Sequence, residues 1–75
     1  MGTEVHELEG RIVLAQEDRF RLELDDGRSI LLILGSGTGR SMGELEGWAA
    51  TGRRVHLRFR GREDYGPVAE EVLPL

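Results

Sequence analysis

The residues best suited to bind a ligand in this chain are its arginines. All ten basic side chains are arginine, against fourteen acidic residues, which gives a formal net charge of −4. Residues 53–62 (RRVHLRFRGR) hold five arginines and no acidic residue, whereas residues 1–26 hold eight acidic residues and three arginines. Such a segregation of charge can create a local positive field on an acidic protein. A guanidinium can clamp a phosphate through two hydrogen bonds or stack on a nucleic-acid base.

This pattern predicts a nucleic-acid-binding surface of outward-facing arginines, with one tyrosine on which a base could stack. The predicted binding residues are Arg19, Arg21, Arg54, Arg58, Arg60 and Tyr65. The alternative is a solvated face on which the arginines pair with nearby glutamates. Stacking platforms are scarce, because Phe20 and Phe59 are expected to point inward.

Catalytic and metal-binding patterns are weak in this sequence. The run LGSGTGRS at residues 34–41 lies where a phosphate-binding loop would, but Leu34 replaces the first required glycine and Arg40 replaces the lysine. The two histidines, His6 and His56, have no second histidine nearby, and cysteine is absent. The sequence therefore predicts no enzyme activity, no metal and no cofactor.

The hydrophobic periodicity predicts five strands and one helix. Arg19–Leu24 and Arg53–Arg60 alternate strictly between apolar and polar residues, as half-buried strands do. Ser41 and Glu44 form a capping-box pattern, and Gly52 is a suitable end for the helix. The expected elements are strands at Glu4–Gln16, Arg19–Leu24, Ser29–Leu34, Arg53–Arg60 and Val68–Leu73, and a helix at about 42–51.

Two strands carry specific expectations about which side chains face the core. Gly10 predicts a bulge or sharp bend in the first strand, with Ile12 and Leu14 on one face and Arg11 and Val13 on the other. In Ser29–Leu34, a three-residue turn before the strand would point Leu31 and Ile33 outward, whereas a two-residue turn would swap the faces. Either arrangement leaves large aliphatic residues on the outer face, which suits a protein partner or a homodimer.

The order of three strands, a helix and two strands is typical of one fold. It predicts a single all-β domain over residues 1–75, a five-stranded Greek-key barrel of the OB type with one short helix between the third and fourth strands. An SH3-like barrel is the alternative, although its helical turn normally lies between the last two strands.

The first hairpin resembles that of bacterial translation initiation factor one, which is a lone OB domain of similar length. The likeness rests on GRIVLAQEDRFRLELDDG at residues 10–27, and more weakly on TGRRVHL at residues 51–57. It implies an OB fold and a surface that contacts RNA. The basic loop and arginine-bearing tail of that family are replaced here by residues 35–46, with Arg40 as their single arginine, and by Glu70 and Glu71 near the end.

These observations predict a small, non-enzymatic binding module. Its partner is either nucleic acid, bound by the outer arginines, or a protein, bound by Leu31 and Ile33, with a homodimer as one form of the second case. The longest apolar run, Ile30–Leu34, is far shorter than the ~20 residues that span a bilayer. We therefore expect no membrane partner and a cytoplasmic location.

Overall fold

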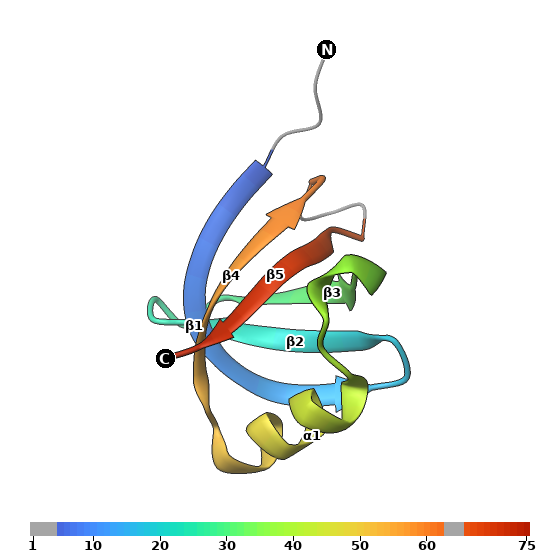
Figure 1. Cartoon of the computed structure of the whole chain (residues 1–75). Helices are drawn as coiled ribbons and strands as arrows, with labels where there is room; N and C mark the ends of the chain where they lie inside the picture. The colour runs from blue at the N-terminus through green and yellow to red at the C-terminus, as the bar shows by residue number, and fades with distance from the viewer. Residues whose placement is uncertain (1–4, 63–65) are drawn as a thin grey trace.

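Five strands and one α-helix make up most of the chain in the computed structural model, which describes residues 5–62 and 66–75 (Figure 1). The elements are β1 (Val5–Gln16), β2 (Arg19–Leu24), β3 (Ser29–Leu34), the short 3-10 turn η1 (Ser36–Thr38), α1 (Met42–Thr51), β4 (Arg54–Arg60) and β5 (Val68–Pro74). The predicted strands and helix are confirmed to within one residue, apart from Glu4, the predicted start of the first strand, which lies outside the described residues. The predicted loop after β3 differs, because it contains η1, in which Thr38 bonds to the Gly35 carbonyl through both its backbone N–H and its hydroxyl.

The strands form one strongly curved sheet in the order β1-β2-β3-β5-β4, and β4 pairs again with β1. All neighbours are antiparallel except β3 and β5, which run parallel and pair only at Ile33–Val68 and Leu34–Ala69. The long β1 curves around one side of the molecule (Figure 1) and serves two partners, β4 through its first half and β2 through its second.

Gly10 lies where β1 changes partner, since it pairs with both Leu24 of β2 and Val55 of β4. A Cβ atom at this position would lie only 2.4 Å from the backbone oxygen of Glu23. Only glycine therefore allows the two backbones to approach so closely. Gly10 is thus the residue at which the curved β1 passes from β4 to β2.

The bulge of β1 lies further along, and it overturns the expectation that Leu14 faces the core. Ile12 pairs with Leu22, but Leu14 pairs with Arg21, so Val13 is an extra residue between them. An extra residue reverses the alternation of the strand beyond it. Ile12 is fully buried, whereas Leu14 is 47% exposed and Ala15 packs against the core in its place.

The turn between β2 and β3 is three residues long and settles the orientation of β3. The Leu24 N–H bonds to the Arg28 carbonyl, and Gly27 closes the turn with φ +91°, a left-handed conformation that favours glycine. Ile30 and Leu32 consequently face inward and Leu31 faces outward, at 43% exposure. Ile33 is half-buried.

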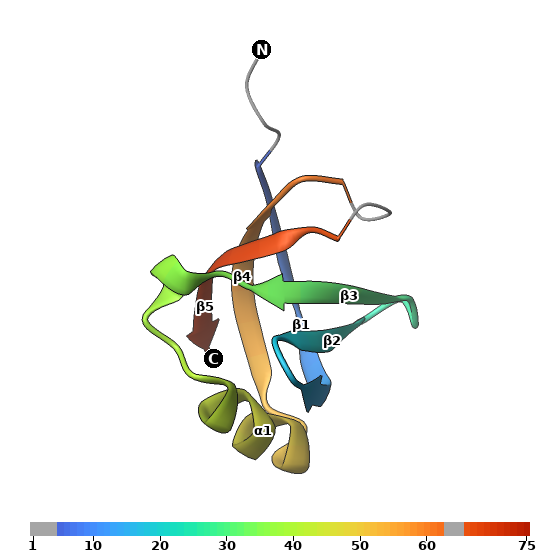
Figure 2. The same cartoon turned by 90° about the vertical axis from the view of Figure 1, so that its right-hand side faces the viewer.

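The core lies inside the curved sheet, and α1 covers one end of it (Figure 1 and Figure 2). The inward residues expected from alternation in β2 and β4 are all buried: Phe20, Leu22, Leu24, Val55, Leu57 and Phe59. Helix α1 adds the fully buried Leu45, with the capping box of Ser41 and Glu44 at its start and Gly52 at its end. Among residues 5–62 and 66–75, no helix has the length and apolar character needed to cross a membrane.

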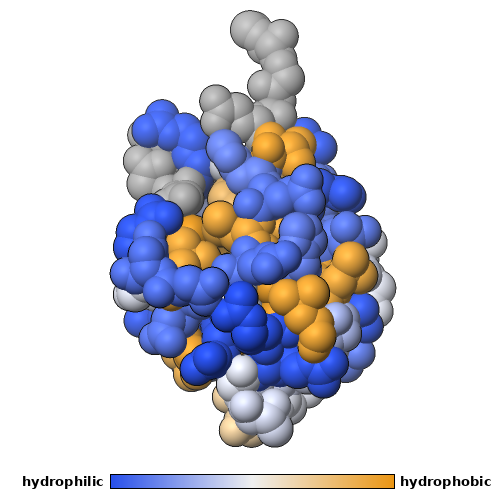
Figure 3. All heavy atoms as spheres, turned by 90° about the vertical axis from the view of Figure 1, so that its left-hand side faces the viewer, coloured by the Kyte–Doolittle hydropathy of each residue, from blue (hydrophilic) through white to orange (hydrophobic). Residues whose placement is uncertain are grey.

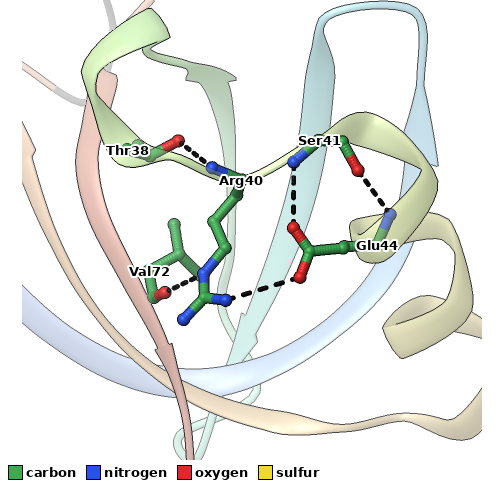
Figure 4. A network of polar contacts seen from close by, with 5 residues as sticks. All are labelled: Thr38, Arg40, Ser41, Glu44 and Val72. Carbon is green, nitrogen blue, oxygen red and sulfur yellow. Dashed lines mark hydrogen bonds and ion pairs between the residues drawn. The ribbon is translucent and has the colours of Figure 1, made fainter.

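Arg40 links the loop before α1 to β5. Its Nε donates a hydrogen bond to the Val72 carbonyl at 2.9 Å, and its Nη1 lies 3.4 Å from Oε2 of Glu44 (Figure 4). Its guanidinium carbon lies 5.3 Å from the centroid of the Trp48 ring. The segment that resembled a phosphate-binding loop thus directs its arginine at the protein's own backbone.

Candidate functional site

The predicted arginines fall on two different surfaces. Arg54, Arg58 and Arg60 lie on the outer face of β4, between β1 and β5, whereas Arg19 and Arg21 lie on the outer face of β2. Tyr65 lies outside the described residues. Two arginines do meet across strands, because Arg54 pairs with Arg11 of β1.

The arginines of β4 face acidic side chains that sequence reasoning could not assign to them. Nη1 of Arg54 lies 2.7 Å from Oδ1 of Asp25, and this hydrogen bond, together with the charge of Arg54, lowers the pKa of that carboxyl. Arg58 Nη1 lies 3.6 Å from Oε1 of Glu71. Each of these cations is therefore balanced by a neighbouring carboxylate.

Arg60 follows the same pattern at the end of β4. Its Nε donates to Oε2 of Glu70 at 3.0 Å, and this hydrogen bond lowers the pKa of Glu70. Seen from the side of β1, the surface is largely hydrophilic, with small hydrophobic patches between the polar side chains (Figure 3). Because cations and carboxylates alternate on the outer face of β4 and its neighbours, the positive charges do not add up to a continuous positive stripe there.

His56 of β4 also contacts acidic side chains. Its Nε2 lies 2.8 Å from Oε1 of Glu7 and its Nδ1 lies 3.1 Å from Oε2 of Glu9. Hydrogen bonds to the two carboxylates, that to Glu7 first, raise the pKa of the imidazole. Both ring nitrogens are thus occupied by different carboxylates, an arrangement that stabilises an imidazolium.

The outer face of β2 is different, because its arginines lie among aliphatic side chains. Leu14 of β1, Arg21 of β2 and Leu31 of β3 form one row across three strands. A hollow of about 330 Å³ lies over this row, and we call it the outer groove. It is lined by Leu14, Gln16, Glu17, Arg19, Phe20, Arg21 and Leu31.

The charges in the outer groove are poorly balanced by comparison with β4. Arg19 Nε lies 3.8 Å from Oδ1 of Asp18, and both side chains are more than half exposed, so this contact contributes little. Arg21 has no hydrogen bond or ion pair to any residue within 5–62 and 66–75. The groove therefore offers guanidinium groups that a ligand can reach.

The structure joins the two predicted sites in part. Arg19 and Arg21, expected to bind nucleic acid, line the same hollow as Leu31, expected to bind protein. Ile33 does not line the hollow and pairs with Val68 of β5.

Leu14 is a groove residue that the sequence did not predict, because the bulge at Val13 that turns it outward was not anticipated. The two-residue turn at residues 17–18 could have indicated this orientation, because it places Gln16 opposite Arg19 and therefore Leu14 opposite the outward-facing Arg21.

The described part of the chain buries no polar or charged residue. It also brings no three histidine or acidic side chains into an arrangement able to hold a metal ion. A further hollow, of about 570 Å³, lies between Gly35–Gly37 and the paired side chains of Arg58, Arg60 and Glu70.

Comparisons of the chain with models of protein families, with curated proteins and with solved structures found no match.

Proposed function

We propose that the curved sheet is a closed five-stranded Greek-key barrel of the OB type, similar in fold to initiation factor one. Three features support this: α1 lies between the third and fourth strands, β1 pairs with both β2 and β4, and β3 meets β5 in a short parallel contact. In OB barrels the face of the second and third strands and the adjoining loops bind ligands. The outer groove lies on that face.

We further propose that the protein is a non-enzymatic module that binds a protein partner through the outer groove. The observation that carries this proposal is the row Leu14, Arg21, Leu31, in which two leucines more than 40% exposed flank a guanidinium without a carboxylate partner among the described residues. Val13, 39% exposed in the bulge, adds a further exposed apolar side chain of β1 next to Leu14. Clustered exposed aliphatic residues are typical of protein interfaces.

The neutralised arginines of β4 favour a protein over nucleic acid. A nucleic-acid surface needs uncompensated positive charge, and Arg54, Arg58 and Arg60 each face a carboxylate. Single-strand-binding OB domains also use outward aromatic side chains. Phe20 is the one aromatic residue that lines the outer groove, and it is only 1% exposed.

Single-stranded nucleic acid is the second candidate partner. The position of Arg19 and Arg21 on β2 favours it, since these cations lie on the face that OB barrels use for oligonucleotides. Salt-sensitive binding of single-stranded RNA at ~50 mM salt, lost in Arg21→Gln, would support this candidate.

Affinity capture with a matched pair of variants tests the protein-binding proposal. Leu31 and Leu73 are almost equally exposed, at 43% and 42%, but Leu73 lies on β5 opposite His56. Proteins that bind to the immobilised wild type and to Leu73→Asp should no longer bind to Leu31→Asp. Identical retention by both variants contradicts the proposal.

Self-association through the same groove is one form of this function. Sedimentation would then show a dimer for the wild type and for Leu73→Asp, and a monomer for Leu31→Asp. A wild-type monomer at high concentration leaves only a different protein as the partner.

A further inference from the structure

We propose that the outer groove binds an extended peptide segment in which an acidic residue lies between two aliphatic residues. This inference rests on the proposed protein-binding function and names the chemistry of the partner.

The geometry of the groove sets the order of groups in the ligand. Leu14, Arg21 and Leu31 are direct cross-strand neighbours, so they succeed one another at about 4.8 Å along the hydrogen-bonding direction of the sheet. The row is therefore about 10 Å long and reads aliphatic, cationic, aliphatic. In an extended peptide every second side chain faces the same way, at about 6.6 Å spacing. A segment with aliphatic, acidic and aliphatic residues at alternate positions presents these groups in the same order over about 13 Å, slightly more than the length of the row.

The positive charges of Arg19 and Arg21 favour a ligand that carries a carboxylate. Arg21 lacks an acidic partner among residues 5–62 and 66–75, and Arg19 has only the long, exposed contact with Asp18. Glu17 is the one acidic residue among the groove's lining residues. A guanidinium donates two parallel hydrogen bonds to a carboxylate, and such bonds are stronger where neighbouring groups exclude water. Leu14 and Leu31 would exclude water on both sides of such a pair.

The aliphatic flanks distinguish a peptide from an oligonucleotide. A phosphate would also satisfy Arg21, but the adjoining bases need flat aromatic surfaces, and the groove supplies leucines instead. Leucine side chains gain more from contact with the aliphatic side chains of a peptide.

The test measures binding of labelled peptides to the full chain by fluorescence anisotropy. The probe has the sequence Ser-Leu-Ser-Asp-Ser-Leu-Ser, and two control peptides replace Asp by Asn or both leucines by Ser. We expect the probe to bind at least about fivefold more tightly than either control, since one charge-assisted pair or two aliphatic contacts are each worth about that factor.

Variants of the protein assign the binding to the groove. Arg21→Gln should weaken binding of the probe about tenfold, whereas Arg53→Gln, with the same change in net charge and its Nε on the Leu75 carbonyl, should leave it unchanged. Glu17→Gln should tighten binding about two- to threefold, because it removes a negative charge that repels the acidic residue of the probe. A gain of affinity cannot result from loss of folding.

Three results would overturn the inference. The Asp and Asn peptides could bind alike, Arg21→Gln could bind as tightly as Arg53→Gln, or a single-stranded oligonucleotide could bind more tightly than the probe and lose that binding in Arg21→Gln. If capture of a protein depends on Leu31 while the peptides are not distinguished, this inference fails and the proposed function stands. If neither depends on the groove, both fail.

Discussion

The Nε of Arg40 donates a hydrogen bond to the carbonyl oxygen of Val72, 32 positions further along the chain, at 2.9 Å. The bond joins the loop before α1 to β5, at the place where the parallel contact of β3 and β5 has already ended. The same guanidinium reaches Glu44 and lies over the ring of Trp48. One side chain therefore ties together the loop, the helix and the last strand.

Replacing Arg40 should destabilise the fold more than replacing an exposed arginine. Arg40→Ala leaves the Val72 carbonyl without its side-chain donor and removes the contact with Trp48, so the free energy of unfolding should fall by about 1–3 kcal/mol. Arg19→Ala, whose ion pair is long and exposed, should cost less than about 0.5 kcal/mol. Urea unfolding of both variants measures the difference, and equal effects would contradict this role for Arg40.

Gly10 and Gly47 should respond to the same substitution with opposite signs. Gly10→Ala forces a methyl group against the Glu23 carbonyl, so the free energy of unfolding should fall by about 1–3 kcal/mol. Gly47 lies within α1, and a methyl group added there would meet nothing within 4 Å, so Gly47→Ala should raise the free energy of unfolding by about 0.5–1 kcal/mol through helix propensity. Urea unfolding checks both, and a neutral Gly10→Ala would show that β1 can bend without glycine.

Ser41 should stabilise α1 through its hydroxyl. Ser41→Ala removes the acceptor for the Glu44 N–H, which lies 3.2 Å from the Ser41 oxygen, and should cost about 1 kcal/mol of unfolding free energy. Ser41→Thr keeps a hydroxyl and should cost less. Thermal unfolding followed by circular dichroism compares the two, and equal losses would exclude the capping bond as the cause.

The pattern of alternation predicted the elements and most inward faces of this fold. Phe20, Leu22 and Leu57 are buried as expected, because strict alternation in a half-buried strand depends only on local periodicity. The expectation for Leu14 was wrong for a reason that is not local. The turn at residues 17–18 fixes the register of β1 with β2 at the end of the strand, whereas burial in the core fixes the inward orientation of Ile12. Both conditions are met only if Val13 forms a bulge between them.

The balance of charges could not be predicted from the order of residues. Arg54 meets Asp25 from 29 positions away, and His56 meets Glu7 and Glu9 from more than 40. These contacts depend on which strands pair and in which register. The arginine-rich stretch therefore suggested a basic surface, whereas Arg54, Arg58 and Arg60 of β4 each face a carboxylate.

The ion contacts of His56 should make stability depend on pH. The pKa of the imidazole is raised above its ordinary value, first by the hydrogen bond with Glu7 and then by that with Glu9. Both ring nitrogens can donate only when the ring is protonated. A raised pKa in the folded state means that the stabilisation is complete below the ordinary pKa of histidine and is lost as pH rises through the raised value. The free energy of unfolding should therefore fall as pH rises from the ordinary pKa of histidine, about 6.5, through the raised pKa of His56.

Two variants separate this effect from other titrations. Glu7→Gln should lower the pKa of His56 more than Glu9→Gln, because Glu7 makes the shorter contact, 2.8 Å against 3.1 Å. His56→Gln should flatten the pH dependence of urea unfolding over the same range, while His6 remains present in both proteins. Nuclear magnetic resonance titration of the His56 ring protons measures the pKa directly. An ordinary pKa that neither glutamate variant changes would mean that the two carboxylates do not hold the imidazolium in solution.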